Sequence, residues 1–287
     1  MPYTVAFSFE KFYENINLPG DHRDTANRRR NDLVDILKNN FHIIEAFASG
    51  SIPRYTAVKG YADLDVIVAL HYEKHIKGKK PSEILQEVRD ALAEYRTNVR
   101  KNGQAVTLYY KTWPNVDIVP ASRIADGAGN VTGYKIPDMN NEVWIKSKPK
   151  THTSNITSRA GTCGASFRKI ITMIKWWNHK HGEYLQSYHI EAMALQIFTG
   201  PLSDMPWDVF TFFNKASTLI QSSLWYEGTY VDEYLSDSQR QEAKKRLETA
   251  RDKSRDAWFK THGDNNDNEG AIAIWRQIFG DKFPAYG

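Results

Sequence analysis

Residues 50–66, GSIPRYTAVKGYADLDV, contain the most informative motif of the sequence. It leads from a Gly-Ser turn into LDVIVAL, residues 64–70, an almost entirely apolar run that is typical of a strand buried on both faces. Asp63 and Asp65 lie two residues apart at the start of that run. Because side chains alternate along a strand, both carboxylates are expected on one face. Two neighbouring carboxylates repel each other, so the pattern predicts that cations compensate their charge.

A third carboxylate, Asp117, lies in a second apolar run, VDIV at residues 116–119, which a neighbouring strand could bring to the same point. Three carboxylates could hold two Mg²⁺ ions, because this hard cation prefers oxygen ligands and commonly bridges carboxylates to phosphates. One ion would lower the pKa of an attacking hydroxyl, and the other would stabilise a leaving pyrophosphate. The alternative is that Asp63 and Asp65 are solvated residues at the mouth of a strand.

The Gly-Ser turn is predicted to bind phosphate. Gly50 allows the backbone to approach a ligand closely, and Ser51 adds a hydroxyl to the backbone N–H groups of the turn. Eleven residues separate this turn from Asp63. The turn and the aspartates together predict a site where metal ions and phosphates meet.

The pattern around this stretch predicts an α+β fold. Before residue 150, helices are expected over residues 25–39 and from Ser82 to about Val99, with strands over residues 41–48, 105–110, 115–121 and 142–146 and a hairpin at residues 126–130. After residue 150, helical periodicity dominates, including a charged helix over residues 236–256 and a last helix over residues 269–279. We therefore predict a catalytic lobe of residues 1–150 and a helical nucleotide-binding lobe of residues 151–287, with the active site in the cleft between them.

Composition narrows the class of protein. The chain has 287 residues with a formal net charge of +4, and 41% of them are hydrophobic, which indicates a globular protein rather than a disordered one. Its single cysteine, Cys163, excludes an internal disulfide framework and a Cys-rich zinc site. His179 and His181 are not predicted to bind zinc, because they have no Cys partner and are poorly spaced on a helix for one metal. No apolar run approaches the length of a membrane span, and the first residues, MPYTVAFSFEKF, lack the features of a signal peptide, so a cytoplasmic location without membrane contact is expected.

Charge is unevenly distributed along the chain. Residues 143–182 hold no Asp or Glu, yet they carry eight Lys and Arg residues: Lys146, Lys148, Lys150, Arg159, Arg168, Lys169, Lys175 and Lys180. Such a cluster would favour the binding of polyphosphate. The alternative is a solvated basic face, which is the usual meaning of a charge run.

The order of these motifs resembles the polymerase-β-like nucleotidyltransferase superfamily: Gly-Ser, then DLDV, then VDIV some 50 residues later. With RKIITMIKWWNHKHGEYLQSYHIEAMALQIF, residues 168–198, the sequence resembles the bacterial CD-NTases. These are cyclic-oligonucleotide synthases related to animal cyclic GMP-AMP synthase and to DncV, and the resemblance suggests the CdnE-like clade. The resemblance implies a polymerase-β-like nucleotidyltransferase lobe followed by a helical lobe.

By that resemblance, Asp63, Asp65 and Asp117 match the catalytic, metal-binding triad, and Gly50 and Ser51 match the nucleotide-binding turn. Three further residues match the family's nucleotide-binding positions: Lys175 on the triphosphate, the Ser187 hydroxyl on phosphate, and the Tyr188 ring on a base. Each has a bland alternative. Lys175 could extend to solvent from a half-buried helix, and Tyr188 could be a core residue with a bonded hydroxyl. Trp176 and Trp177 are expected in the core, and Thr56 matches a frequent family threonine to which no role is assigned.

The resemblance implies an enzyme that joins NTPs, ATP among them, into a cyclic dinucleotide or oligonucleotide and releases pyrophosphate. It would use two Mg²⁺ ions, for which Mn²⁺ can substitute, and would act as a monomer in bacterial anti-phage signalling through a cyclic-nucleotide-binding effector. No nucleic-acid activator is evident from the sequence. Two alternatives share these residues: a nucleotidyltransferase that tails RNA or modifies a small molecule, and a non-catalytic nucleotide- or RNA-binding module.

Overall fold

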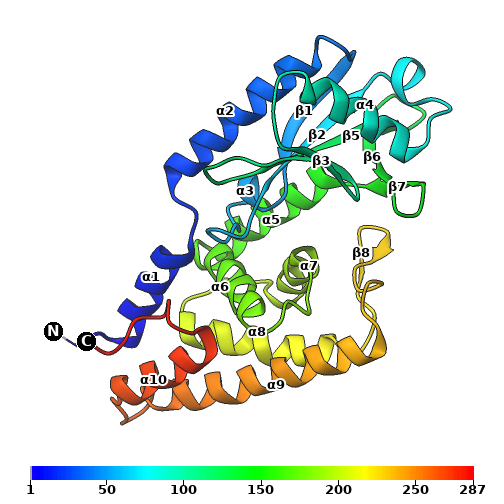
Figure 1. Cartoon of the computed structure of the whole chain (residues 1–287). Helices are drawn as coiled ribbons and strands as arrows, with labels where there is room; N and C mark the ends of the chain where they lie inside the picture. The colour runs from blue at the N-terminus through cyan, green and yellow to red at the C-terminus, as the bar shows by residue number, and fades with distance from the viewer. Residues whose placement is uncertain (1) are drawn as a thin grey trace. The chain divides into compact units, whose positions relative to one another are not determined.

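The computed structural model describes residues 2–287 and confirms the α+β class (Figure 1). The chain forms two compact units. Unit 1 combines the N-terminal segment up to Asn17 with Asn155–Gly287, and unit 2 comprises Leu18–Ser154. The functional lobes 1–150 and 151–287 stay a prediction.

Unit 2 is built on a seven-stranded mixed sheet. Its main path runs in the order β1-β2-β5-β4-β3, with β6 paired to β5 and β7 paired to β6. Strands β2 and β5 are parallel, and the other pairs are antiparallel. The strands are β1 (Ile43–Ser49), β2 (Leu64–Leu70), β3 (Val99–Asn102), β4 (Ala105–Leu108), β5 (Val116–Ala125), β6 (Val131–Asp138) and β7 (Val143–Ser147).

The two faces of this sheet differ. One face packs with the helices of unit 2 in a large apolar cluster that includes Leu33, Leu85, Val66 and Ile118. The other face carries a smaller cluster, formed by Ile67, Ala69, Ala105, Val119, Ala121 and Tyr134. The helices are α2 (Gly20–Leu37), α3 (Ser51–Arg54), the single π-turn η1 (Tyr72–Ile76) and α4 (Pro81–Ala93).

The sequence prediction was wrong about one helix boundary in this unit. Val99 is not on the helix that begins near Ser82 but starts strand β3, because α4 ends at Ala93 and the chain turns before the strand. Asn98, with φ of 58°, lies in the left-handed region that ends regular structure.

Unit 1 is mostly helical. Its first helix, α1 (Val5–Ile16), was not predicted from the sequence. Thr4 caps it by accepting a hydrogen bond from Phe7 N, and its Phe9 ring lies 4.8 Å from the Trp275 ring. The other helices are α5 (Pro149–Cys163), which crosses the boundary between the units, α6 (Ser166–Lys180), α7 (Ser187–Ile197), α8 (Met205–Leu219), α9 (Asp237–Phe259) and α10 (Asn268–Phe279), and a small hairpin joins β8 (Trp225–Tyr226) to β9 (Thr229–Tyr230).

The core prediction for Trp176 and Trp177 is confirmed, because both side chains are buried. The free thiol of Cys163 is buried as well. Within residues 2–287, no helix is both long and apolar enough to cross a membrane.

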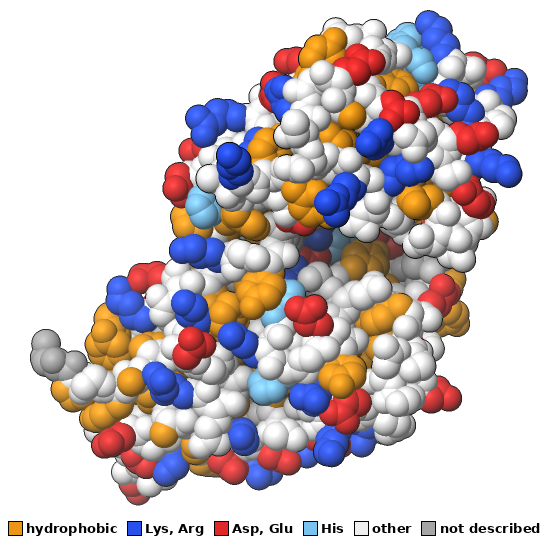
Figure 2. All heavy atoms as spheres, in the orientation of Figure 1, with side chains coloured by type: hydrophobic (Ala, Val, Ile, Leu, Met, Phe, Trp, Pro, Cys, Tyr) orange, Lys and Arg blue, Asp and Glu red, His pale blue; other side chains and the backbone are white. Residues whose placement is uncertain are grey.

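The acid-free segment does not form one uniform basic surface. Its lysines pair with carboxylates from distant parts of the chain: Lys150 Nζ lies 2.6 Å from Glu45, and Lys169 Nζ lies 2.6 Å from Glu10. Figure 2 likewise shows basic and acidic side chains interleaved over the visible face. The fold therefore balances part of this charge, since Lys150, Lys169, Lys175 and Lys180 form ion pairs with carboxylates.

Candidate active site

Strands β2 and β5 place two of the three predicted aspartates side by side. In their parallel register Asp65 is the direct partner of Asp117, so both side chains lie on the same face of the sheet. Asp63 comes immediately before β2, two residues from Asp65. The pairing of these two strands thus brings together carboxylates that are 52 positions apart in the sequence (117 minus 65).

Asp63 and Asp117 each form a hydrogen bond with a residue that was not identified from the sequence. Thr107 is buried on β4 directly opposite Asp117, and its Oγ1 donates a 2.5 Å hydrogen bond to Asp117 Oδ1. Asn115, at the entrance to β5, hydrogen-bonds to Asp63. In the sequence, Thr107 was visible only as a polar residue inside an apolar run. Its contact with Asp117 could not be predicted, because it depends on how the strands pair.

Burial and mutual repulsion disfavour the charged forms of these carboxylates. Burial, and next the charge of Asp117, raise the pKa of Asp65 to about 7. Burial also raises the pKa of Asp63 and of Asp117. Arg54 opposes this shift at Asp65, and its side chain is buried one turn beyond the Gly-Ser turn. Arg54 was not identified from the sequence, although a basic residue so close to the Gly-Ser turn could have indicated a partner for the aspartates.

The Gly-Ser turn packs directly on Asp65. Gly50 has φ of +73°, and a Cβ atom built on it would lie 1.7 Å from Asp65 Oδ2. Only glycine fits here, for reasons of both backbone conformation and space. Ser51 follows as the first residue of α3, and Thr56, buried, donates its backbone N–H to Ser51 O at 3.1 Å. The structure therefore joins Gly50, Ser51 and Asp65 into one local arrangement.

The donor set suits a hard divalent cation. Three carboxylates with raised pKa values gain from a bound positive charge, and their oxygens are the ligands that Mg²⁺ prefers. Over residues 2–287, no three His, Cys, Asp or Glu side chains already converge as a metal site. Like charges repel, so we expect full convergence of the aspartates to depend on the cation itself.

The three other predicted residues lie in unit 1. Lys175, on α6, is buried, and its Nζ lies 2.6 Å from Oε1 of Glu191, which is also buried. The alternative in which Lys175 extends to solvent is therefore wrong. Glu191 lies one turn after Ser187 on α7, so the ion pair ties α6 to the helix that begins with the predicted Ser-Tyr pair.

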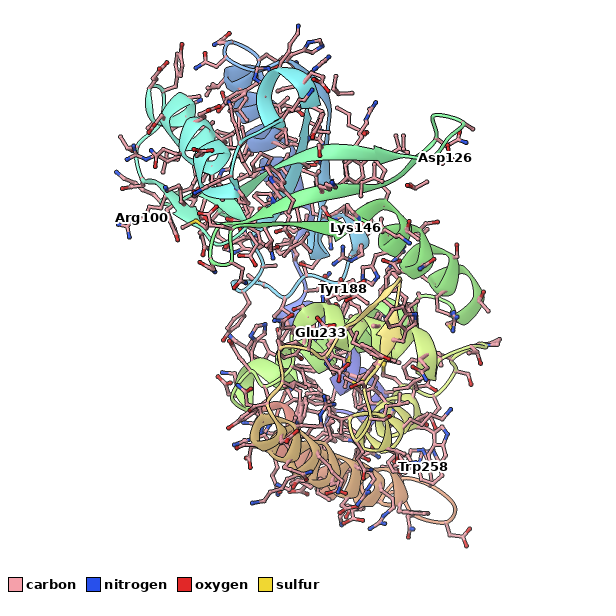
Figure 3. All side chains as sticks on the ribbon, turned by 90° about the vertical axis from the view of Figure 1, so that its right-hand side faces the viewer. Arg100, Asp126, Lys146, Tyr188, Glu233 and Trp258 are labelled. Carbon is pink, nitrogen blue, oxygen red and sulfur yellow. The ribbon has the colours of Figure 1, made fainter. Side chains whose placement is uncertain are left out.

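Ser187 and Tyr188 begin helix α7. Ser187 is exposed, and Tyr188, labelled in Figure 3, is half-buried. The Tyr188 hydroxyl donates to Glu227 Oε2 at 3.3 Å, and its ring lies 5.7 Å from that of Tyr226. Asn155 also donates to Glu227, at 3.0 Å. Glu227, Tyr226 and Asn155 are neighbours of Tyr188 that the sequence pattern did not reveal.

The mixed sheet, with aspartates at the beginning of the neighbouring strands β2 and β5, is typical of a nucleotidyltransferase. Residues 3–159 match the SMODS family, described as the Second Messenger Oligonucleotide or Dinucleotide Synthetase domain. The chain belongs to this family and is a bacterial CD-NTase, a nucleotidyltransferase that synthesises cyclic oligonucleotides.

Two relatives in sequence support this assignment. A protein of Acinetobacter sp. named cyclic AMP-AMP-AMP synthase is 26% identical over 286 residues, covering 88% of this chain and 78% of the relative. A probable cyclic nucleotide synthase of Bacillus cereus is 22% identical and covers 100% of this chain and 99% of the relative.

Solved structures share the fold at low sequence identity. CdnC of E. coli MS115-1, solved with ATP, has a TM-score of 0.77 at 18% identity, covering 97% of this chain and 98% of that one. CdnG of Bradyrhizobium diazoefficiens, solved with GTP, has a TM-score of 0.76 at 15% identity, covering 96% and 94%. A CdnE from Capnocytophaga granulosa has a TM-score of 0.69 at 14% identity, covering 88% of each chain. These likenesses do not single out the CdnE-like clade, which stays a prediction.

Proposed function

We propose that this CD-NTase joins nucleoside triphosphates at a site formed by Asp63, Asp65 and Asp117, releases pyrophosphate, and closes the product into a ring. One observation carries the proposal: Asp65 and Asp117 are paired positions of two parallel strands, and Gly50 packs against the Asp65 carboxylate. This arrangement supports the proposal because it would bring metal-binding oxygens next to a phosphate-binding turn.

The three aspartates would hold two Mg²⁺ ions, or Mn²⁺ in their place. When bound, such ions lower the pKa of an attacking hydroxyl and neutralise charge on the leaving pyrophosphate. Thr107 orients Asp117 and Asn115 orients Asp63 through their hydrogen bonds.

We propose nucleotide-binding residues in each unit. Backbone N–H groups at Gly50 and the hydroxyl of Ser51 would bind the phosphate chain. In unit 1, we propose that the Ser187 hydroxyl binds phosphate and that the Tyr188 ring stacks on a base, which is worth roughly 1–3 kcal/mol per base. A contact between Lys175 and the triphosphate would require its ammonium group to turn from Glu191.

The substrates are NTPs, and we propose ATP as one of them, because the Acinetobacter relative is named for a product made only of AMP. The attacking group is a 3′ or 2′ hydroxyl, and the product is a cyclic dinucleotide or oligonucleotide. We further propose that the enzyme acts as a cytoplasmic monomer and that its product activates a cyclic-nucleotide-binding effector in anti-phage defence.

The test is to incubate the protein with labelled NTPs and Mg²⁺ or Mn²⁺, treat the mixture with phosphatase, and identify the products by mass spectrometry. A phosphatase-resistant cyclic product supports the proposal. Extended RNA would indicate a tailing enzyme, and an absence of NTP consumption with every metal would indicate a non-catalytic module.

Substitution of single aspartates tests whether they form the catalytic site. Asp63→Asn and Asp65→Asn should abolish the product while the circular dichroism spectrum stays native. Asp126→Asn is the matched control, because Asp126 lies at the tip of the β5–β6 turn (Figure 3), where it accepts hydrogen bonds only from that turn. Normal turnover by Asp65→Asn would refute the metal assignment.

A further inference from the structure

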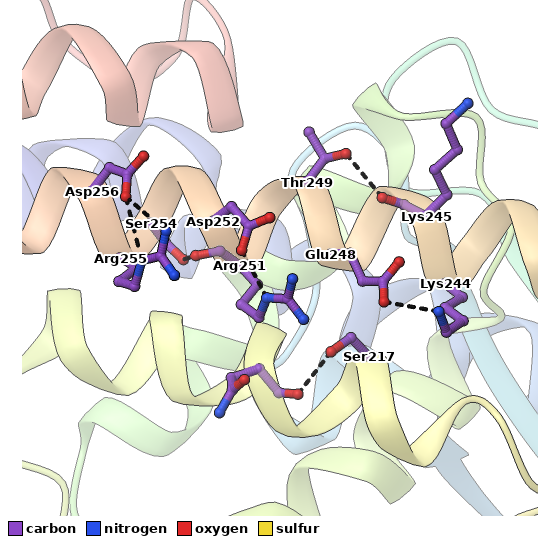
Figure 4. A network of polar contacts seen from close by, with 11 residues as sticks. Ser217, Lys244, Lys245, Glu248, Thr249, Arg251, Asp252, Ser254, Arg255 and Asp256 are labelled. Carbon is purple, nitrogen blue, oxygen red and sulfur yellow. Dashed lines mark hydrogen bonds and ion pairs between the residues drawn. The ribbon is translucent and has the colours of Figure 1, made fainter.

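Helix α9 has two differently charged sides. Along one side, basic groups are paired with acids of the same helix: Lys244 Nζ lies 2.8 Å from Glu248, and Arg251 Nε lies 2.9 Å from Asp252. The side chain of Lys245, the next residue after Lys244, points away from these pairs (Figure 4). Two adjacent lysines of one helix therefore differ sharply in their surroundings.

Lys245 lines a cavity of about 280 Å³ formed within unit 1 by α6, α9 and α10. Helix α9 contributes Lys245, Arg246, Thr249 and Lys253 to its wall, and α10 contributes Gln277. Three of these groups carry a positive charge, whereas the Thr249 hydroxyl already donates to the Lys245 carbonyl at 2.9 Å. The cavity therefore has a basic side on α9, beside apolar residues such as Trp177 and Ile278.

The positive charge of this wall is not neutralised by the protein. Among residues 2–287, the ammonium groups of Lys245 and Lys253 make no ion pair and no hydrogen bond. The one carboxylate in the wall is Glu242, which pairs with Arg246 Nη2 at 2.9 Å. Its charge therefore offsets Arg246 and leaves the two lysines uncompensated.

Arg246 lies in the same wall but is already engaged by the protein. Its guanidinium lies over the Tyr184 ring, 5.0 Å from the ring centroid, and its Nη2 pairs with Glu242. Its Nε is enclosed by protein atoms. A ligand in the cavity would therefore be bound mainly through Lys245 and Lys253.

We propose that this cavity binds a ligand that carries several linked phosphates. Lysine and arginine are the usual phosphate binders of proteins. Lys245 and Lys253 are eight residues apart, which places them about 12 Å apart along the helix axis, too far for one phosphate group to contact both closely. A polyphosphate chain or a nucleic-acid backbone offers several linked phosphates, so each of the two long lysine side chains can reach toward a different one.

The proposal is tested on the full chain in EDTA with two probes: inorganic tripolyphosphate, and a single-stranded RNA oligonucleotide with a 5′ hydroxyl. The double variant Lys245→Gln/Lys253→Gln should weaken binding of at least one probe roughly fivefold, as expected for two exposed charge contacts. If the strand is the ligand, the slope of log K against log salt should also fall by about 1.4.

The matched control is Lys244→Gln/Lys260→Gln. It removes the same charge from the same helix, but from lysines that pair with Glu248 and Asp267. The control should bind both probes within twofold of the wild type. Loss of tripolyphosphate binding alone assigns the site to a nucleotide, and loss of RNA binding assigns it to a strand. Equal loss in both double variants, or no loss in either, would overturn the proposal.

The same variants separate this cavity from the catalytic site. Any binding of the probes at the aspartates contributes equally to all three proteins, so the difference between the double variants reports on the cavity alone. With NTPs and metal, Lys245→Gln/Lys253→Gln should keep the basal rate of product formation. A lost basal rate together with unchanged probe binding would also overturn the proposal.

Discussion

Two groups of charges on the same face of the unit 2 sheet have opposite electrostatic behaviour. Glu45 on β1 pairs in register with Ala69, and Asp65 lies four residues before Ala69 on β2, so both acidic side chains point to the same side. The pKa of Glu45 falls to about 2, while that of Asp65 rises to about 7. Apolar residues such as Ile67 lie between the two groups.

The difference comes from the partners of each carboxylate. Burial alone would raise the pKa of Glu45, but Lys150, Arg123 and the Tyr134 hydroxyl all donate to it, at 2.6, 2.6 and 2.8 Å, and they outweigh burial. Asp65 instead faces further carboxylates. The protein thus supplies its own cations where a charge has a structural role, and leaves charge uncompensated where an external cation is expected to bind.

The largest expected effect is on catalysis at the uncompensated group. Asp65→Asn should lower product formation by at least about 10³-fold, because a metal ligand is lost. The same variant should unfold at higher denaturant concentration than the wild type in EDTA at pH 8, since a repelling charge has been removed. Urea titration followed by circular dichroism measures this, and a lower stability of Asp65→Asn would contradict the account of Asp65 as an uncompensated charge.

Removing one charge from the buried ion pair of unit 1 should destabilise the protein, whereas removing the Asp65 charge should stabilise it. Glu191→Gln leaves the Lys175 ammonium buried without its partner charge, and we expect the free energy of unfolding to fall by about 3–5 kcal/mol. The double variant Lys175→Met/Glu191→Leu should recover most of that loss, because it removes both charges. Chemical denaturation of the three proteins tests the pair, and a double variant as unstable as Glu191→Gln would argue against the ion pair as the cause.

A smaller effect is expected from the hydrogen bond that orients Asp117. Thr107→Val should weaken metal affinity about tenfold, as loss of a partner behind a metal ligand typically does. Thr107→Ser keeps the hydroxyl and should restore affinity. Mn²⁺ binding followed by electron paramagnetic resonance measures affinity directly, and equal affinities for the valine and serine variants would exclude this role.

The smallest effect is expected at the compensated carboxylate. Glu45→Gln should lower the free energy of unfolding at pH 7 by about 1–2 kcal/mol, with little effect on turnover. Because the pKa of Glu45 is lowered, its contribution is complete above its ordinary pKa and is lost as the pH falls through about 2. Stability curves between pH 5 and pH 2 should therefore be flatter for the variant, and parallel curves would contradict the assignment.

Local patterns predicted the central part of the fold well. The apolar run at residues 64–70 matches β2, Leu64–Leu70, because a strand buried on both faces needs an uninterrupted apolar sequence. The expectation that Asp63 and Asp65 share one face stays a prediction, because Asp65 lies on β2 whereas Asp63 comes immediately before it. Helix α1 was missed because the interactions that stabilise it, such as the contact of Phe9 with Trp275, come from the far end of the chain.

Long-range contacts explain what local patterns did not reveal at the site. Thr107 and Asn115 are ordinary polar residues until β4, β5 and β2 pair and bring them to the aspartates. Charge patterning was misleading for a similar reason, since Lys150 and Lys169 find their acids 105 and 159 residues away. Lys175 is another case, because its partner Glu191 lies on the next helix.

Three features could be inferred from the sequence alone: the strand that carries Asp65, the need for glycine at position 50, and the order of motifs that resembles the CD-NTases. These are properties of neighbouring residues, and backbone periodicity and local sterics are enough to infer them. Only the tertiary structure decided which charges are neutralised within the protein: Glu45 and Lys175 are, whereas Asp65, Lys245 and Lys253 are not. Electrostatic compensation depends on distance in space, and the fold sets that distance.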